Sequence, residues 1–180
     1  MEDPDPQIVA AARDGDLRAF ETIVRRYQPD VWRLAYHLLH DETAAEDVTQ
    51  EAFVRVFRFL PRYRGDSKFS TWMFSVARNC ALDEIRRSQR RRRAIERVGA
   101  EPPGPVAEPT RRLEIREALA ELPIELREPI VWIDMFGTSY QEVARVMGIP
   151  VGTIKSRVHR GRELLAAALL PRTKETEGEA

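Results

Sequence analysis

Apolar residues recur at helical spacing along most of this chain, and no stretch of useful length alternates apolar and polar residues as a strand does. Residues 94–110 break the pattern, because they hold four prolines and two glycines among small and acidic residues, a composition typical of a linker. The 180 residues leave room for one ordinary domain or two small ones. The sequence therefore predicts an all-α fold with two small helical domains, at 6–93 and 111–170, a flexible linker at 94–110 and a disordered tail at 171–180.

Proline and capping residues place the expected helix ends. Pro29 should interrupt the first amphipathic run, because a proline inside a helix removes a hydrogen bond. Asp41 or Thr43 can cap a later helix, and Ser70 is a fair N-cap for a long helix that continues to the arginine run near Arg93. The expected helices span residues 6–27, 31–39, 43–60, 71–93, 110–121 and 124–136.

Residues 139–165 have the pattern of a helix-turn-helix. Ser139, followed three residues later by Glu142, is a capping box that starts a short helix. Gly148 can take the left-handed conformation that ends this helix, and Pro150 suits the first turn of the next one. The second helix has one apolar stripe at helical spacing, formed by Ile154, Val158 and Leu165 with Leu164 beside it.

Polar and cationic residues occupy a separate face of this second helix: Lys155, Ser156, His159 and Arg160. The small residues Gly152 and Thr153 at its start would let the helix approach a DNA backbone closely. Docking in the major groove of DNA requires a second helix with cations on its outer face. Another interpretation stays open, in which the segment is a helix hairpin whose charged face meets only water.

The formal net charge of zero hides an uneven distribution along the chain. Residues 1–60 hold 7 arginines and 12 acidic residues, whereas residues 61–100 hold 11 basic and 4 acidic residues. Residues 135–172 hold 6 basic and 2 acidic residues. Two basic blocks indicate two contact sites for one polyanion, and the acidic N-terminal third suits a protein partner better.

The loop at 62–70 mixes aromatic and cationic residues. Tyr63 and Phe69 lie among arginines and Lys68, and Trp72 and Phe74 follow. Such a mixture suits single-stranded DNA, whose exposed bases can stack on aromatic rings. Because Phe69 and Trp72 could equally pack in the core, a mixed role is the interpretation that we favour.

Six arginines lie within eight residues of the following helix: Arg86, Arg87, Arg90, Arg91, Arg92 and Arg93. At helical pitch they surround the helix, so no single neighbouring surface can bury them. Phosphate is their natural partner, and a solvated basic linker end is the alternative.

The stretch at 46–60 has an apolar stripe on one side. Asp47, Gln50, Glu51 and Val54 lie on another side, bordered by Phe53. An acidic and amide surface of this kind can pair with basic residues of a partner helix. A plain solvated helix face would give the same pattern.

Catalytic and metal sites find little support in the sequence. His37 and His40 stand three residues apart beside Asp41 and could supply metal ligands, but no further residues complete a ligand set. Cys80 falls in an apolar stripe and is expected to be buried. No phosphate loop or nucleophile elbow is present. We expect no catalytic residue and no cofactor, and a small metal-dependent enzyme is the least favoured hypothesis.

Composition also indicates where the protein works. No apolar run approaches the ~20 residues of a membrane span, and the acidic N-terminus lacks the pattern of a secretory signal. The single cysteine excludes an internal disulfide framework and fits a reducing compartment. We therefore expect a cytoplasmic protein that does not insert into a membrane.

Three segments together resemble the bacterial sigma factors of the extracytoplasmic-function group: residues 41–58, 63–87 and 121–165. They occur in the order of that family, and the resemblance covers roughly residues 6–92 and 111–168. It implies a sigma region 2 domain and a sigma region 4 domain, without the middle domain of primary sigma factors. By this resemblance the chain is the promoter-recognition subunit of RNA polymerase, with no catalysis of its own.

The resemblance also implies roles for individual residues. The polymerase clamp helices would be bound by Asp47, Gln50, Glu51 and Phe53. The −10 element would be captured by the loop residues Arg64, Asp66, Ser67, Lys68, Phe69 and Ser70, and its opened strand held by Trp72, Arg78, Asn79, Arg86 and Arg87. The −35 element would be met by Thr153, Lys155, Ser156, Arg157, His159 and Arg160. The family often has a larger aromatic residue where His159 stands, which leaves the base preference there open.

The partners implied by the resemblance are core RNA polymerase, through its clamp helices and flap, promoter DNA and an anti-sigma factor. A polymerase-independent helix-turn-helix regulator, acting as a dimer, is the alternative. That alternative would leave the loop at 62–70 and the acidic helix unexplained.

Overall fold

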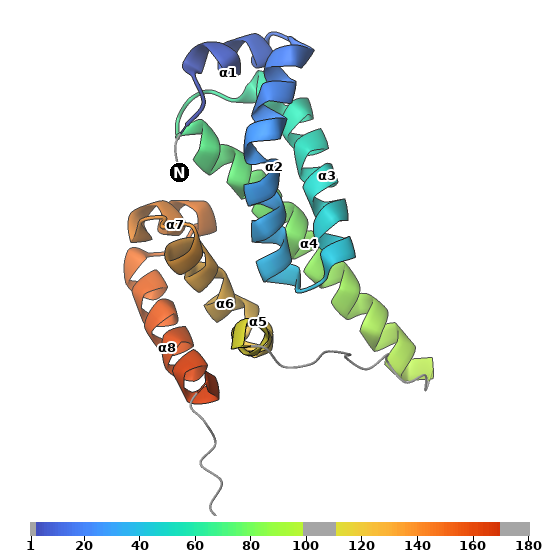
Figure 1. Ribbon diagram of the computed structural model, residues 1–180, viewed down its shortest axis with the longest axis vertical. Coiled ribbons are helices and arrows are strands. Elements are labelled where there is room, and N and C mark those ends of the chain that lie inside the picture. The colour runs from blue at the N-terminus through green and yellow to red at the C-terminus, as the bar shows by residue number, and fades with distance from the viewer. Residues whose placement is uncertain (1–2, 99–110, 170–180) are drawn as a thin grey trace, which may run out of the picture.

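The computed structural model describes residues 3–98 and 111–169, and within these ranges the regular structure is helical throughout. The N-terminal module consists of α1 (Pro6–Arg13), α2 (Leu17–Leu39), α3 (Glu42–Phe59), the short 3-10 turn η1 (Leu60–Arg62) and α4 (Phe69–Val98). The C-terminal module consists of α5 (Arg111–Glu121), α6 (Ile124–Ile130), the π turn η2 (Val131–Met135), α7 (Tyr140–Met147) and α8 (Val151–Leu169) (Figure 1). The all-α prediction is confirmed.

The chain turns between α1 and α2, where the sequence predicted one continuous helix. Gly15 has a φ of +100°, which residues with a side chain rarely adopt, so the first helix cannot continue through it. The carboxylate of Asp16 then caps α2 by accepting hydrogen bonds from the backbone N–H groups of Arg18 (2.8 Å) and Ala19 (3.2 Å).

Helix α2 continues through Pro29, so the predicted interruption there is wrong. A proline inside a helix costs about 3 kcal/mol, because a hydrogen bond is lost and the ring crowds the preceding turn. Burial on both sides of the proline opposes that cost: Tyr27, Val31 and Leu34 are all in the core. Tertiary packing therefore decides the length of this helix.

Helix α4 differs from the prediction at both ends. It begins at Phe69, one residue before the expected cap Ser70, and it extends to Val98, so residues 94–98 of the predicted linker are helical. The remainder of that linker, residues 99–110, and the predicted tail at 171–180 lie outside the described residues.

The helix expected at 124–136 is divided into α6 and η2, where Phe136 N–H donates to the carbonyl of Val131 (3.3 Å).

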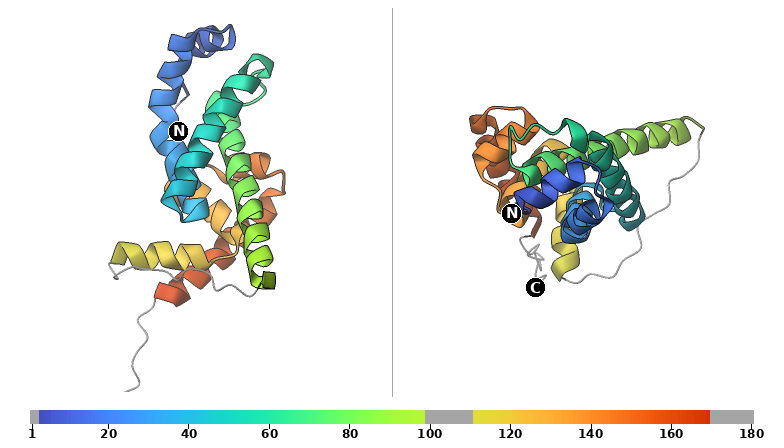
Figure 2. Two further views of the ribbon diagram at one scale, coloured as in Figure 1. Left: turned by 90° about the vertical axis from the view of Figure 1, so that its right-hand side faces the viewer. Right: turned by 90° about the horizontal axis from the view of Figure 1, so that it is seen from above.

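Helices α2, α3 and α4 form the bundle at the centre of the N-terminal module, with Leu34, Val56 and Met73 almost completely buried between them. The C-terminal module lies beside α2 and α4 (Figures 1 and 2). Phe74 of α4 contacts Trp132, and their ring centroids are 6.0 Å apart. One buried cluster therefore runs through both modules.

Candidate nucleic-acid interface

The predicted helix-turn-helix is present as α7, a tight turn and α8. The hydroxyl of Ser139 accepts a hydrogen bond from Glu142 N–H (3.2 Å), and the Glu142 carboxylate accepts one from Ser139 N–H (3.2 Å), which completes the capping box. The hydroxyl of Ser139 also donates to this carboxylate, and that bond lowers the pKa of Glu142. Gly148 ends α7 with a φ of +68°. Local capping interactions, which the sequence predicted, therefore define both ends of α7.

Helix α8 presents a polar face to solvent. Its apolar side is held by Ile154 and Val158, which are buried, whereas Leu164 is 44% exposed. The exposed polar residues on the opposite side are Lys155, Ser156, His159 and Arg160, and the half-buried residues at their margin are Thr153 and Arg157. The −35 residues predicted from the sequence thus lie together on one helix.

Several of these side chains form no ion pair with another residue that the structure describes. Among the described residues, no ion pair involves Lys155, Arg157 or Arg160, whereas His159 lies 3.4 Å from the carboxylate of Glu163. Arg162, one turn farther along, is paired with Asp134 at 2.5 Å. The unpaired cations at the start of α8 leave positive charge available for a polyanion.

The loop between η1 and α4 is organised by an aromatic cluster. Tyr63, Phe69 and Trp72 pack together, with ring centroids 5.1–5.7 Å apart, and the Tyr63 hydroxyl donates to the carbonyl of Ser67 (2.5 Å). Phe69 is only 3% exposed. Of the residues predicted to capture the −10 element, Arg64, Asp66 and Lys68 are exposed, Ser67 is half-buried, and Phe69 and Ser70 are buried. Burial of Phe69 and Ser70 fits the structural part of the mixed role predicted for this loop, and the binding part stays a prediction.

The first described residue, Asp3, lies against this loop. Its carboxylate accepts hydrogen bonds from the backbone N–H groups of Phe69 (3.0 Å) and Ser70 (3.1 Å) and from the Ser70 hydroxyl. A cleft of about 630 Å³ separates the segment at 3–6 and α1 from Tyr63, Gly65 and Phe69. Asp3 thus supplies the cap of α4 from a part of the chain that local sequence patterns could not connect with it.

On α4, the residues predicted to hold the opened strand differ in accessibility. Asn79 is exposed and Trp72 is half-buried. The Arg78 side chain is only 14% exposed, because its guanidinium donates to both carboxylate oxygens of Glu128 from α6, with Nη2–Oε2 at 3.1 Å. Arg78 is therefore engaged between the modules in this arrangement.

The arginine run continues α4 away from the bundle. Arg86 pairs with Asp83 (3.2 Å), and Arg87 lies near Glu84 (3.4 Å) and Glu51 (3.6 Å). These guanidiniums remain exposed, so the pairs are weak and can yield to phosphate.

The acidic and amide face of α3 is present, with one change. Asp47 and Gln50 are exposed, and Glu51 is half-buried and pairs with Arg55 at 2.5 Å. Phe53, which the sequence placed at the border of this surface, is 8% exposed and belongs to the core. Val54, the apolar residue predicted on this face, is 67% exposed.

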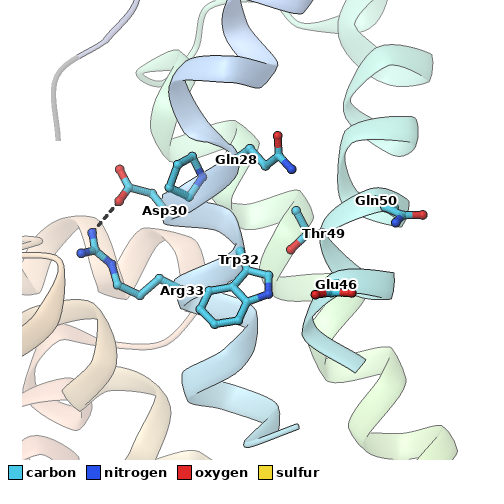
Figure 3. A pocket seen from close by; sticks show the side chains of 8 residues that line it. Gln28, Asp30, Trp32, Arg33, Glu46, Thr49 and Gln50 are labelled. Carbon is cyan, nitrogen blue, oxygen red and sulfur yellow. Dashed lines mark hydrogen bonds and ion pairs between the residues drawn. The ribbon is translucent and has the colours of Figure 1, made fainter. Parts of the chain in front are cut away.

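A groove of about 600 Å³ lies beside this face, between α2 and α3 (Figure 3). Trp32 of α2 and Thr49 and Gln50 of α3 line it, and Asp30 pairs with Arg33 at its edge (2.5 Å). The α3 face is therefore not flat, because it borders a recess in which Pro29 and Trp32 lie among polar side chains.

Neither the histidines nor the cysteine forms a reactive site. Burial lowers the pKa of His37 and of His40 to about 4, with further contributions from Arg116 and Arg127 respectively. Burial raises the pKa of the Cys80 thiol to about 11, which keeps it protonated and unreactive. Within the described ranges, no three His, Cys, Asp or Glu side chains gather closely enough to hold a metal ion. None of the helices at 3–98 and 111–169 is long and apolar enough to cross a membrane.

Comparison with known families accounts for both modules. The family model of sigma-70 region 2 matches residues 23–91, and that of sigma-70 region 4 matches residues 112–165. The chain belongs to the sigma-70 family. Its relatives place this sigma factor in the extracytoplasmic-function group, as the resemblance implied.

Two curated relatives match almost the whole sigma factor. The RNA polymerase sigma-H factor of Pseudomonas aeruginosa is 33% identical, and the alignment covers 97% of this chain and 98% of the relative. The extracytoplasmic-function RNA polymerase sigma-E factor of Escherichia coli is 34% identical over 93% of this chain and 95% of its own length. These relatives are transcription initiation factors rather than enzymes.

Two solved structures share the fold of this sigma factor. The sigma factor RpoE in complex with the anti-sigma factor NepR from Bartonella quintana is 26% identical, with a TM-score of 0.71 over 85% of this chain and 98% of that one. CnrH in complex with the cytosolic domain of CnrY is 28% identical, with a TM-score of 0.69 over 91% of this chain and 95% of that one.

Two residues that bear on the site were missed by the sequence reasoning: Asp3 and Glu128. No local signal identifies the partner of either residue, because each meets its partner across more than 45 residues of chain. The apolar residues around Glu128 were a weak hint, since a carboxylate among them must find a cation if it is buried.

Proposed function

We propose that this sigma factor binds core RNA polymerase and directs it to promoters through two DNA contacts. Region 4 would read a −35 element as intact duplex, and region 2 would hold a −10 element as an opened strand. The observation that carries the proposal is the separation of two different surfaces on the two modules. One is the cationic face of α8, and the other is the aromatic and cationic loop that leads into α4.

The −35 contact would use the exposed face of α8. Lys155 and Arg160, which form no ion pair within the described residues, can reach phosphates or base edges, and Ser156 and His159 lie between them. Thr153 and Arg157 at the margin would set the approach of the helix to the backbone. A helix with this arrangement fits the major groove.

The −10 contact would use the loop and the outer side of α4. Arg64, Asp66 and Lys68 would meet the extruded base and its neighbours, supported from below by buried Phe69 and Ser70. Asn79, Arg86 and Arg87 would follow the strand, with Ser67, Trp72 and Arg78 completing the set. Extruding a base costs a few kcal/mol, which contacts of this kind can offset. Because both DNA sites act through one polymerase, two weak contacts can give adequate selectivity.

Polymerase docking would use α3. Asp47, Gln50 and Glu51 would meet the clamp helices of the largest catalytic subunit, with the outward Val54 as their apolar neighbour and Phe53 supporting the surface from the core. Region 4 would contact the flap. Exposed acidic residues suit a basic partner surface and speed its association.

An anti-sigma factor would regulate this activity in the cytoplasm, and the sigma factor would catalyse no reaction itself. The likeness to a sigma factor solved with an anti-sigma factor supports the first point. Affinity capture of the tagged protein from its native cell, followed by mass spectrometry, would test for polymerase and inhibitor together.

Transcription from defined templates tests the central proposal. Core polymerase and this protein would be incubated with a pool of DNA sequences, and the templates that support initiation would be selected. We expect selected templates to share two elements and to contain unpaired thymines near −10 in permanganate footprints. No promoter-directed initiation across the pool would refute the function. A symmetric site bound by a dimer without polymerase would favour the alternative regulator instead.

A further inference from the structure

The loop at 63–70 is tied at both of its ends by hydrogen bonds. At the first end, the Tyr63 hydroxyl donates to the carbonyl of Ser67 (2.5 Å). At the second end, the Asp3 carboxylate accepts hydrogen bonds from the N–H groups of Phe69 (3.0 Å) and Ser70 (3.1 Å) and from the Ser70 hydroxyl. The exposed residues of the loop therefore lie between two fixed points.

The second tie is needed because the N-cap position of α4 has no side-chain acceptor. The N–H of Trp72 donates to the carbonyl of Lys68 (3.1 Å), which makes Lys68 the N-cap residue. A lysine side chain carries only donors, so it cannot accept the free N–H groups of the first turn. The Asp3 carboxylate supplies this acceptor, and its negative charge suits the positive end of the helix dipole. The start of α4, and with it Phe69, is therefore held from outside the helix.

Asp3 belongs to a short and stiff arm, residues 3–6. Pro4 and Pro6 each fix a backbone φ at about −65°, and Pro4 is buried. Asp5 lies between them and caps α1 through its side chain. Helix α1 in turn packs against α2 and η1. The Asp3 carboxylate thus reaches the loop from a support that is attached to the rest of region 2.

The arm also borders the part of the loop that is proposed to meet DNA. The cleft of about 630 Å³ beside the arm is lined on the loop side by Tyr63, Arg64 and Gly65. Burial raises the pKa of the Tyr63 hydroxyl, and the nearby charges of Asp3 and Asp66 raise this pKa further. Asp3 therefore acts on the aromatic residue at the start of the loop as well as on the helix at its end.

We infer that Asp3 is a positioning residue for −10 recognition, which holds the loop at 63–70 in the shape that captures an extruded base. This inference rests on the proposed strand-binding role of region 2. A loop that is ordered before DNA arrives loses less conformational entropy on binding than a loop that the DNA must order. Contacts with a particular base depend on the shape of the loop, whereas contacts of exposed cations with phosphate do not. Loss of the Asp3 carboxylate should therefore reduce the preference for the −10 sequence more than the binding of any strand.

Amide hydrogen exchange followed by NMR tests the tie without DNA. Asp3→Asn keeps the size of the side chain but removes its charge and one of its two acceptor oxygens. Asp14→Asn is the matched control, because Asp14 is an exposed aspartate at the other end of α1. In the full-length protein, we expect the N–H groups of Phe69 and Ser70 to exchange about tenfold faster in Asp3→Asn, while exchange in the buried centre of α2 stays the same. Equal exchange of these two N–H groups in both variants would overturn the inference.

Strand binding by the holoenzyme tests the consequence for recognition. Core polymerase with each variant would be titrated with two labelled single strands, one carrying the −10 sequence selected by transcription and one with the same bases in scrambled order. We expect Asp3→Asn to bind the selected strand about fivefold more weakly and the scrambled strand nearly as well as the unaltered protein does. Asp14→Asn should match the unaltered protein on both strands.

Three other results of this titration would contradict the inference. Equal weakening on both strands would assign Asp3 a general structural role, tighter binding of the selected strand would show that the arm obstructs DNA, and unchanged binding would show that the tie does not matter for recognition. The proposed function is tested separately, because the selection of templates uses the unaltered protein. Failure of that selection would refute the function, whereas the hydrogen exchange result would still report on the tie.

Discussion

Cations of the same type have different surroundings along this chain, and their surroundings decide what they can bind. The arginines at the start of the run on α4 lie beside carboxylates of α3 and α4, and Arg78 is buried against Glu128. Arg160 on α8 is exposed, and no ion pair within the described residues involves it. A free guanidinium releases counterions when it meets phosphate, whereas a paired one must first lose a protein partner.

Substitution of Arg160 tests this difference. Arg160→Ala should weaken binding to a selected −35 duplex by ~1–3 kcal/mol if the guanidinium contacts a base. Arg162→Ala is the matched control, since Asp134 already holds that guanidinium and the effect should be smaller. Fluorescence anisotropy with the duplex measures both, and unchanged binding of the Arg160 variant would remove this residue from the reading surface.

Asp47 provides a corresponding test on α3. Asp47→Arg places a cation where a basic partner surface is proposed, so polymerase affinity should fall by at least tenfold, or about 1.4 kcal/mol. Binding of the isolated protein to a −35 duplex should stay the same, because α8 lies on the other module. Glu42→Arg, an exposed acid in the first turn of α3, serves as the control. Equal loss of polymerase and duplex binding would refute the assignment of this face.

At the scale of the helix, capping decides where α7 begins and ends. The capping box of Ser139 and Glu142 is closed on both sides, and Gly148 ends α7 in the left-handed conformation. These local bonds define the ends of α7 and so the turn from which α8 starts. The opposite case occurs in α2, which continues through Pro29, and at the start of α4, which Asp3 caps. Both features depend on contacts from elsewhere in the fold.

Loss of the cap should therefore be measurable. Ser139→Ala should lower the free energy of unfolding by ~1 kcal/mol, because the N–H of Glu142 loses its acceptor and the Glu142 carboxylate loses a donor. Ser139→Thr keeps the hydroxyl and should restore most of the loss. Urea unfolding followed by circular dichroism measures the change, and equal stability of the alanine and serine proteins would show that the cap contributes nothing.

At the scale of the whole molecule, packing of the C-terminal module against α2 buries two histidines that would otherwise titrate near pH 6.5. His37 and His40 lie near the end of α2, where Arg116 of α5 and Arg127 of α6 approach them. Nδ1 of His37 and Nε2 of His40 are buried and unpartnered within the described residues. The folded protein therefore keeps both rings neutral.

This burial predicts a loss of stability in acid. The folded pKa values of about 4 lie below the ordinary value of 6.5, so the unfolded chain binds more protons between these limits. The free energy of unfolding should thus fall as the pH drops from 6.5 toward 4, by about 2 kcal/mol between pH 7.5 and 5 after allowance for solvent screening. Urea unfolding at several pH values measures this slope.

The double substitution His37→Gln with His40→Asn should flatten the slope, since asparagine tolerates the left-handed φ of +55° at position 40. If the double variant loses stability in acid as steeply as the unaltered protein, other groups cause the effect.

The helical class, the helix-turn-helix with its caps and polar face, and the family with the motifs of both regions could all be predicted from the amino-acid sequence. These features depend on neighbours within a few turns, which periodicity and capping record directly. Only the tertiary structure decided that α2 runs through Pro29, that Phe53 and Phe69 belong to the core, and that Asp3 and Glu128 occupy groups proposed for DNA. Those outcomes arise where burial and charge pairing join residues that are distant in the chain. Contacts of this kind produce no periodic pattern in the amino-acid sequence.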